Sequence, residues 1–218
     1  MTVTTRWWWI RHDKVHNPEN RLYGQSDIAA IISDAGPYER LAPSLPADAL
    51  WLCSHLGRAR ETAAALRPHM EALGQRPPEI LELPEIAEQD FGAWQGMNFT
   101  ELKAHLGHGF DAFWRAPAEA RPPGGESFAD VIARVAEAVG RITAEHPGRD
   151  IIAFAHGGSI RAALAVALDL APGRALSFQI RNLSLTRIDH LIPGEDPQSG
   201  LRYPWRVHQV NQLHPEDD

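Results

Sequence analysis

The chain has 218 residues, and its 21 Lys and Arg against 28 Asp and Glu give a formal net charge of −7 at pH 7. This acidity argues against binding of nucleic acid or anionic membranes through bulk charge, because both need a basic excess, but it leaves room for a local anion-binding pocket. The single cysteine, Cys53, excludes an intramolecular disulfide framework and a cysteine-based zinc site, and no apolar run approaches the roughly 20 residues of a membrane-spanning helix, so we expect a soluble, cytoplasmic protein.

Three short apolar runs predict buried strands at residues 7–10, 49–53 and 151–155. Each run is unbroken and rich in aromatic or β-branched side chains, which is typical of strands covered on both faces in a parallel sheet. Apolar residues at helical spacing follow the second run from Leu56 to Met70 and the third run from Ile160 to Leu168. Strands that alternate with helices indicate an α/β layer architecture.

The remaining elements are predicted from weaker patterns. Apolar residues from Phe128 to Ile142 mark one face of a long helix that begins after the breaker residues 122–125. Residues 183–188 and 205–210 alternate like ordinary strands. We interpret residues 89–123, which have short helical patches among Gly and Pro, as a lid inserted in a single domain over residues 1–218.

Polar residues follow each apolar run at the point where the run ends. Arg11 and His12 end the first, Ser54 ends the second with Arg58 one helical turn further on, and His156-Gly157-Gly158 ends the third. In open α/β sheets, ligands bind outside the carboxyl ends of the strands. If the strands are parallel neighbours, two histidines and two arginines therefore converge on one spot.

These residue types suit the transfer of a phosphoryl group. Guanidinium groups pair with phosphate oxygens, a neutral imidazole can act as a nucleophile, and the Gly157-Gly158 turn lets backbone N–H groups approach an anion. Each feature alone has a simpler structural explanation, such as a hydrogen-bonded core histidine or a solvated helix face, so the inference depends on their joint occurrence. His12 and His16 have the spacing of a metal pair on a helix, but the residues between them are not helical, and we predict no metal site.

With these features in this order, the sequence resembles the histidine phosphatase superfamily, also called the phosphoglycerate-mutase-like family. The resemblance runs in family order over about residues 6–190. It is carried by Arg11-His12, by N-P-E-N-R-L-Y-G at 17–24, by S-H-L-G-R-A-R-E-T-A at 54–63, by the E-x-x-F-G-x-W-x-G pattern at 88–96, by P-G-G-E-S at 123–127, and by A-H-G-G at 155–158 with Arg161.

The resemblance implies a three-layer α/β/α sandwich with a mostly parallel central sheet, and it implies no cofactor. By the same resemblance, His12 would attack phosphorus and form a phosphohistidine, while Arg11, Arg58 and His156 would hold the phosphoryl oxygens. Glu88 would donate the proton to the leaving oxygen and then activate water, which favours mildly acidic to neutral pH. Further phosphate contacts would come from Asn17, Arg21, Gly24 and the backbone of Gly157.

Two departures from the family pattern bear on function. Asp13 stands where the family usually has Gly, and Lys14 where it usually has Glu. A carboxylate beside a phosphate is repulsive unless it points away or pairs with a cation. It could instead hydrogen-bond a loop backbone.

The 35 residues between Glu88 and Gly124 are fewer than the mutases of this family carry, and resemble the compact phosphatases. The expected activity is therefore metal-independent hydrolysis of a small phosphorylated metabolite, with no nucleic-acid or membrane partner. Two alternatives remain, a phosphoglycerate mutase and a catalytically impaired member, disabled by Asp13, that binds a phosphorylated ligand or a partner. The sequence does not predict the oligomeric state.

Overall fold

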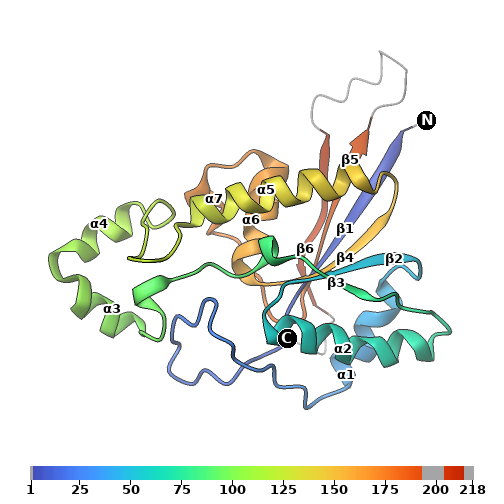
Figure 1. Ribbon diagram of the computed structural model, residues 1–218, viewed down its shortest axis with the longest axis horizontal. Coiled ribbons are helices and arrows are strands. Elements are labelled where there is room, and N and C mark those ends of the chain that lie inside the picture. The colour runs from blue at the N-terminus through green and yellow to red at the C-terminus, as the bar shows by residue number, and fades with distance from the viewer. Residues whose placement is uncertain (1, 193–203, 214–218) are drawn as a thin grey trace.

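The computed structural model describes residues 2–192 and 204–213, which build a six-stranded sheet with helices on both faces (Figure 1). The strand order is β3-β2-β4-β1-β5-β6. The first four strands of this order are parallel to one another, and β5 and β6 are each antiparallel to the strand before them. The strands are β1 (Val3–Arg11), β2 (Ala49–Cys53), β3 (Ile80–Glu82), β4 (Asp150–Ala155), β5 (Leu185–Ile192) and β6 (Trp205–Gln212).

The helices form two layers on either side of this sheet. One face carries α1 (Gly36–Leu41) and α2 (Gly57–Ala72), and the other carries α5 (Phe128–Glu145), α6 (Gly157–Leu168) and α7 (Pro172–Ala175) (Figure 1). This arrangement confirms the three-layer α/β/α sandwich with a mostly parallel sheet. Short 3₁₀ turns lie at Ala42–Ser44, Pro84–Ile86, Gly92–Trp94 and Gly107–Gly109.

Two further helices, α3 (Phe99–Leu106) and α4 (Phe110–Arg115), lie within the segment 89–123 and extend away from the sheet (Figure 1). They match the two helical patches that the sequence indicates there. Asn98 caps α3, because its side chain accepts a hydrogen bond from the Glu101 N–H while the Glu101 carboxylate accepts from the Asn98 N–H. This segment therefore has its own local structure outside the sheet layers.

The long helix α5 shows how local sequence fixes an element. Ser127 and Asp130 form a reciprocal capping box at its start, which satisfies backbone N–H groups that have no helical partner. Its apolar face, which includes Phe128, Val131 and Val135, is buried against the sheet. The helix begins at Phe128, as the sequence predicts, and ends at Glu145, three residues after the last residue of the predicted apolar face.

Strand β1 anchors the centre of the sheet. The side chains of Trp7 and Trp9 are buried and stacked, with ring centroids 5.2 Å apart, on the face covered by α5 and α6. Stacked aromatic pairs of this kind contribute about 0.5–1.5 kcal/mol beyond their buried area. In the parallel register, Arg11 at the end of β1 lies opposite Ala155 at the end of β4. The residues that follow these two strands are thus presented at the same edge.

No helix in residues 2–192 and 204–213 combines the length and the apolar character that a bilayer span requires.

Candidate active site

The structure brings His12 and His156 together at the carboxyl edge of the sheet. Their ring centroids are 5.1 Å apart, and both side chains are completely buried. Arg58, near the start of α2, is also completely buried, and its charge acts on both imidazoles, as does the charge of Arg11. The predicted convergence of two histidines and two arginines is therefore present in the fold.

The His12 ring is held in one tautomer by its own loop. Nδ1 lies 2.6 Å from the carbonyl oxygen of Asp13, an acceptor, so Nδ1 carries the proton and Nε2 keeps its lone pair. Asn182 fixes this loop, because its amide donates to the carbonyls of both His12 and Asp13. Burial, followed by the charges of Arg11 and Arg58, lowers the pKa of His12 to about 3. His12 is therefore a neutral imidazole with its Nε2 lone pair turned away from the backbone.

Four side chains at this site leave buried nitrogen atoms that have no partner among the described residues. These atoms are Nε2 of His12, both ring nitrogens of His156, and the Nε atoms of Arg11 and Arg58. Burial and the neighbouring positive groups also hold the pKa of His156 well below its usual range. Because buried polar groups in folded proteins are almost always paired, such a cluster indicates a site that a ligand completes.

Both guanidinium groups are fixed by main-chain carbonyls. Arg58 donates to the carbonyl of Ser26 at 2.9 Å and to that of Gly24 at 2.6 Å, and Arg11 donates to the carbonyl of Ile180. These bonds use neutral acceptors, and no carboxylate of the described residues forms an ion pair with either guanidinium group. Two oriented guanidinium groups beside two imidazoles form a binding site for an anion such as a phosphoryl group.

Glu88 supplies a carboxylate at the other side of this cluster. Both of its oxygens accept from the N–H of Gly158, at 3.0 and 3.2 Å, and Oε1 also accepts from the N–H of Gln89. A Cβ atom on Gly158 would lie only 2.0 Å from Oε1, so the carboxylate occupies space that only glycine leaves open. The N-terminus of α6 thus holds Glu88 where a negative charge is favoured.

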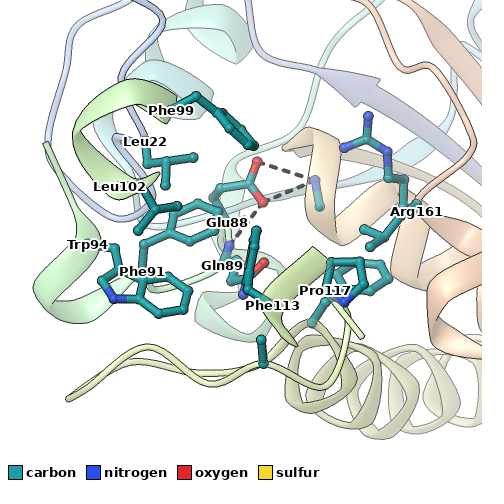
Figure 2. Close-up of a pocket in the computed structure, with 14 residues that line it drawn as sticks. Leu22, Glu88, Gln89, Phe91, Trp94, Phe99, Leu102, Phe113, Pro117 and Arg161 are labelled. Carbon is teal, nitrogen blue, oxygen red and sulfur yellow. Dashed lines mark hydrogen bonds between the residues drawn. The ribbon is translucent and has the colours of Figure 1, made fainter. Parts of the chain in front are cut away.

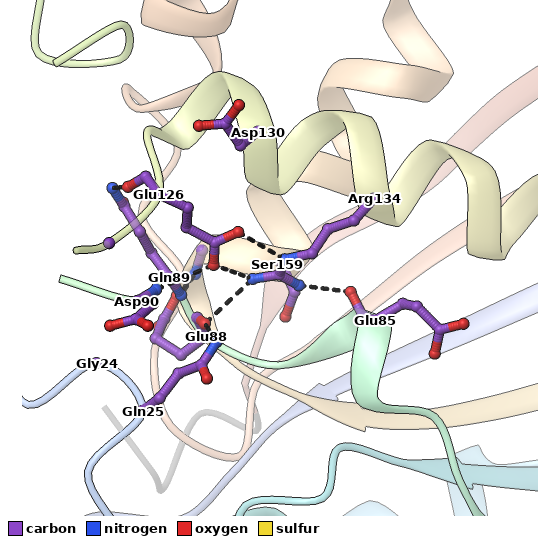
Figure 3. A network of polar contacts seen from close by, with 12 residues as sticks. Gly24, Gln25, Glu85, Glu88, Gln89, Asp90, Glu126, Asp130, Arg134 and Ser159 are labelled. Carbon is purple, nitrogen blue, oxygen red and sulfur yellow. Dashed lines mark hydrogen bonds and ion pairs between the residues drawn. The ribbon is translucent and has the colours of Figure 1, made fainter. Parts of the chain in front are cut away.

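A partly buried polar network holds the Glu88 backbone (Figure 3). The carbonyl of Glu88 accepts from Gln25 at 3.0 Å and from Arg134 at 3.1 Å. Arg134 is in turn paired with the Glu126 carboxylate through two bonds of 2.9 and 2.7 Å. Residues from three separate segments therefore fix the position from which the Glu88 side chain reaches Gly158.

The Asp13 carboxylate is engaged away from the histidine pair. Its Oδ1 accepts from the N–H of Lys14 at 2.7 Å, and its Oδ2 accepts from the hydroxyl of Tyr38 at 2.9 Å. Burial and the nearby Asp13 charge raise the pKa of Tyr38, which keeps this hydroxyl a donor. Asp13 thus hydrogen-bonds the loop backbone and α1, which explains how a carboxylate is tolerated next to His12.

The side chains of Asn17 and Arg21 have hydrogen-bond or ion-pair partners of their own. The Asn17 side chain makes two bonds of 2.9 Å with the backbone of Arg21 and closes their loop. The Arg21 guanidinium, which is partly exposed, binds the carboxylates of Glu19 and Glu101, so its charge is already compensated. For both residues, phosphate contact stays a prediction.

The two predicted glycines lie closer to the cluster. Gly24 has a φ of +41°, a conformation that favours glycine, and its carbonyl accepts from Arg58. Gly157 opens α6, and a Cβ atom there would lie 3.8 Å from Cζ of Arg11 and 3.5 Å from Nη1 of Arg161. The backbone of Gly157 therefore borders the guanidinium groups.

Two residues of the site were given no role in the prediction, although Arg161 belongs to one of the motifs that carry the resemblance. Arg161, on α6, is held by the carbonyl of Phe178 at 2.7 Å and lies next to Gly157. Asn182 supports the backbone on either side of His12. The sequence carries a signal for Arg161, because this residue lies one helical turn after Gly157. It carries none for Asn182, whose role depends on how the residues before β5 pack beside the end of β1.

A cavity of about 220 Å³ adjoins Glu88, Gly158 and Arg161 (Figure 2). Its outer wall comes from the segment 89–123, with Phe91, Trp94 and other apolar side chains turned toward it. In the described part of the chain, no group of three or more His, Cys, Asp or Glu side chains is placed to hold a metal ion.

Comparisons with known proteins show the family to which the chain belongs. The phosphoglycerate mutase 2 of Gloeobacter violaceus, which is 2,3-bisphosphoglycerate-dependent, is 31% identical over 193 residues, covering 85% of each chain. The glucosyl-3-phosphoglycerate phosphatase of Mycobacterium tuberculosis is 31% identical over 215 residues, covering 91% of this chain and 90% of the relative. The native structure of a mycobacterial glucosyl-3-phosphoglycerate phosphatase superposes with a TM-score of 0.77 at 25% identity, covering 95% of this chain and 99% of the other. A model of the histidine phosphatase superfamily (branch 1) matches residues 7–194, and the chain belongs to that superfamily.

Proposed function

We propose that this protein is a metal-independent phosphoric monoester hydrolase that acts on a small phosphorylated metabolite through a phosphohistidine on His12. The observation that carries the proposal is the state of His12. Its Nδ1 proton is held by the Asp13 carbonyl, and its Nε2 lone pair is buried, unpartnered in the described structure, and next to the guanidinium groups of Arg11 and Arg58. A nucleophile facing fixed positive charge is what phosphoryl transfer requires.

In the first step, Nε2 of His12 attacks phosphorus and a P–N bond forms as the ester P–O bond breaks. Arg11, Arg58 and His156 hold the other phosphoryl oxygens, where the negative charge gathers. Protonated Glu88 gives its proton to the leaving oxygen, which departs as the alcohol. The His12 ring becomes cationic, and the Asp13 carbonyl stabilises it by accepting from Nδ1.

In the second step, water attacks the phosphohistidine. The Glu88 carboxylate takes a proton from the water as the new P–O bond forms and the P–N bond breaks. Inorganic phosphate leaves, and both His12 and Glu88 return to their starting states. The hydrogen bonds from the Gly158 N–H fix the position of the Glu88 carboxyl group, from which both proton transfers would take place.

The segment 89–123 is proposed as the lid that selects the substrate. It provides most of the wall of the cavity beside Glu88, and the leaving group would enter this cavity. Arg21 of the loop 17–24 supports this segment, because it binds the carbonyl of Gly96 and the carboxylate of Glu101 in α3.

Phosphoglycerate mutase activity is the second candidate, favoured by the similarity to the Gloeobacter mutase. A mutase returns the phosphoryl group from His12 to another hydroxyl, whereas a phosphatase transfers it to water. The alternative of an impaired ligand-binding member depends on Asp13. The hydrogen bonds that this carboxylate accepts from the Lys14 N–H and the Tyr38 hydroxyl support the hydrolase over that alternative.

The test is a panel of phosphate monoesters incubated with the wild type and with His12→Ala at several pH values. We expect release of inorganic phosphate by the wild type and a loss of about 10³-fold or more in His12→Ala, since a covalent nucleophile is removed. Isomerisation of 3-phosphoglycerate without release of phosphate would favour the mutase. Equal, slow release by both proteins would contradict an enzymatic role for the site.

A further inference from the structure

We propose that the preferred substrate is the phosphate monoester of an apolar alcohol, and that its apolar group fills the cavity under α3 and α4. The inference depends on the proposed phosphatase function and names its substrate class. It starts from a contrast between the two ends of the site, since the phosphoryl end is strongly polar and the adjoining cavity is not.

Ten of the fourteen residues that line the cavity are apolar or aromatic. Most of these apolar residues belong to the segment 89–123, including Phe91, Trp94, Phe99, Leu102 and Phe113 (Figure 2). Trp94 and Phe113 meet edge to face, with ring centroids 5.5 Å apart, and form a firm aromatic wall. Such a surface binds apolar groups by removing them from water.

The cavity lies where the leaving group must go. Glu88 and Gly158 belong to its lining, and Glu88 is the proposed donor to the leaving oxygen. The carbon skeleton attached to this oxygen therefore passes from Glu88 into the cavity. Arg161 also lines it, but its Nη1 atom lies 3.5 Å from the Cβ position of Gly157, which places that charge at the phosphoryl end.

The cavity offers few hydrogen bonds to a polar leaving group. The Gln89 side chain donates to the carbonyl of Glu126 at 2.8 Å, and Nε of Arg161 donates to the carbonyl of Phe178 at 2.7 Å. The indole N–H of Trp94 is buried with no partner in the described residues, which adds one donor at most. A glycerate, serine or sugar would therefore bury hydroxyl or charged groups without partners, which is unfavourable.

The volume of the cavity limits the size of the apolar group that it can hold. A cavity of about 150 Å³ lined by apolar side chains is large enough for benzene, and this one measures about 220 Å³. It therefore suits one aromatic ring with a short linker, or a branched alkyl group of similar size.

The test compares phosphate esters of primary alcohols, which have similar leaving groups and differ in polarity. The substrates are 2-phenylethyl phosphate, glycerol 1-phosphate, O-phosphoserine and 3-phosphoglycerate, and the measured quantity is kcat/KM for phosphate release. We expect 2-phenylethyl phosphate to exceed each polar ester by about tenfold or more, because apolar burial is gained and unpaired polar groups are avoided.

Two variants connect this selectivity to the cavity. Phe99 is 44% exposed and lines the cavity, so Phe99→Ser is compatible with folding. It is expected to lower the ratio of kcat/KM between 2-phenylethyl phosphate and glycerol 1-phosphate by about fivefold. Leu73, the residue that follows α2, is 50% exposed and is not among the residues that line the cavity, so Leu73→Ser is expected to leave the ratio at the wild-type value.

The results that would contradict the apolar substrate class differ from those that would contradict the phosphatase function. If the wild type hydrolyses a polar ester as well as or better than 2-phenylethyl phosphate, or if both variants change the ratio equally, the apolar substrate class is wrong and the phosphatase function stands. If the wild type releases no phosphate from any ester, the proposed function fails, and the inference fails with it.

Discussion

A methyl group on Gly158 would occupy the space of the Glu88 carboxylate. The Cβ atom of Gly158→Ala would lie 2.0 Å from Oε1, and ordinary contacts begin at 3.4 Å, so the carboxylate must retreat by about 1.4 Å. It would also lose the two bonds from the Gly158 N–H. A displacement of about 1 Å in a catalytic group is enough to slow a reaction about 100-fold, or about 2.7 kcal/mol in activation free energy. We therefore expect kcat for an alkyl phosphate to fall about 100-fold.

The assay is steady-state phosphate release, with competitive inhibition by inorganic phosphate as the measure of anion binding. Because the displaced group is not a ligand of the phosphoryl oxygens, the inhibition constant is expected to stay within about threefold of the wild type. Gly140→Ala, in α5, is the control, since no atom of the described residues, apart from its chain neighbours and the backbone of its own helix, lies within 4 Å of its Cβ position. In a protein that already carries Glu88→Gln, the additional substitution Gly158→Ala is expected to lower kcat only slightly further. An unchanged kcat in Gly158→Ala, or an equal loss in the Glu88→Gln background, would refute the assignment of Glu88.

Three other predictions concern the remaining parts of the site. Arg58→Ala removes a buried, charge-assisted ligand worth about 1.5–3 kcal/mol and should lower kcat/KM about 10- to 150-fold; a steady-state assay showing less than a threefold change would place the phosphate elsewhere. Asp13→Gly should leave kcat within about threefold and lower the free energy of unfolding by about 1–3 kcal/mol, because Tyr38 loses its partner; a large gain in kcat would mean that the carboxylate suppresses the chemistry. The pKa of His12 is lowered to about 3 and that of His156 is lowered as well, so below pH 6.5 the unfolded chain takes up protons that the folded chain does not. Stability should therefore decrease as the pH is lowered from 6.5 to about 3, by about 1.4 kcal/mol per pH unit for His12, and His156 acts in the same direction. The slope in urea unfolding should be smaller by that amount in His12→Asn; equal slopes would mean that His12 is protonated in the folded protein.

Much of the fold could be predicted because its central strands are unbroken apolar runs. The runs at 49–53 and 151–155 coincide with β2 and with all but the first residue of β4. Strand β3 was missed, since it has only three residues and Leu81 within it is 47% exposed, so no buried pattern marks it. The strand expected at 183–188 begins and ends later, at Leu185–Ile192, because residue 183 belongs to the turn whose N–H bonds to the carbonyl of Arg11.

The site could be predicted as far as strand ends determine it. His12 and His156 each follow a central strand directly, so sheet topology alone brings them together. The contacts that tune the site join residues far apart in the chain, such as Glu88 with Gly158, 70 positions away, and Asp13 with Tyr38, 25 positions away. No local pattern encodes these contacts, because they depend on how α1 and the segment after β3 pack against the sheet edge.

The central claim is that Nε2 of His12 becomes phosphorylated. Glu88→Gln with p-nitrophenyl phosphate tests it best, because a good leaving group needs no proton donor for the first step, while the loss of the base slows the second. We predict that rapid quenching followed by peptide mass spectrometry finds an acid-labile, base-stable phosphoryl group on the peptide containing His12, and finds none in His12→Asn. A phosphoryl group on another residue, or turnover of the wild type with no trapped phosphohistidine, would contradict the account.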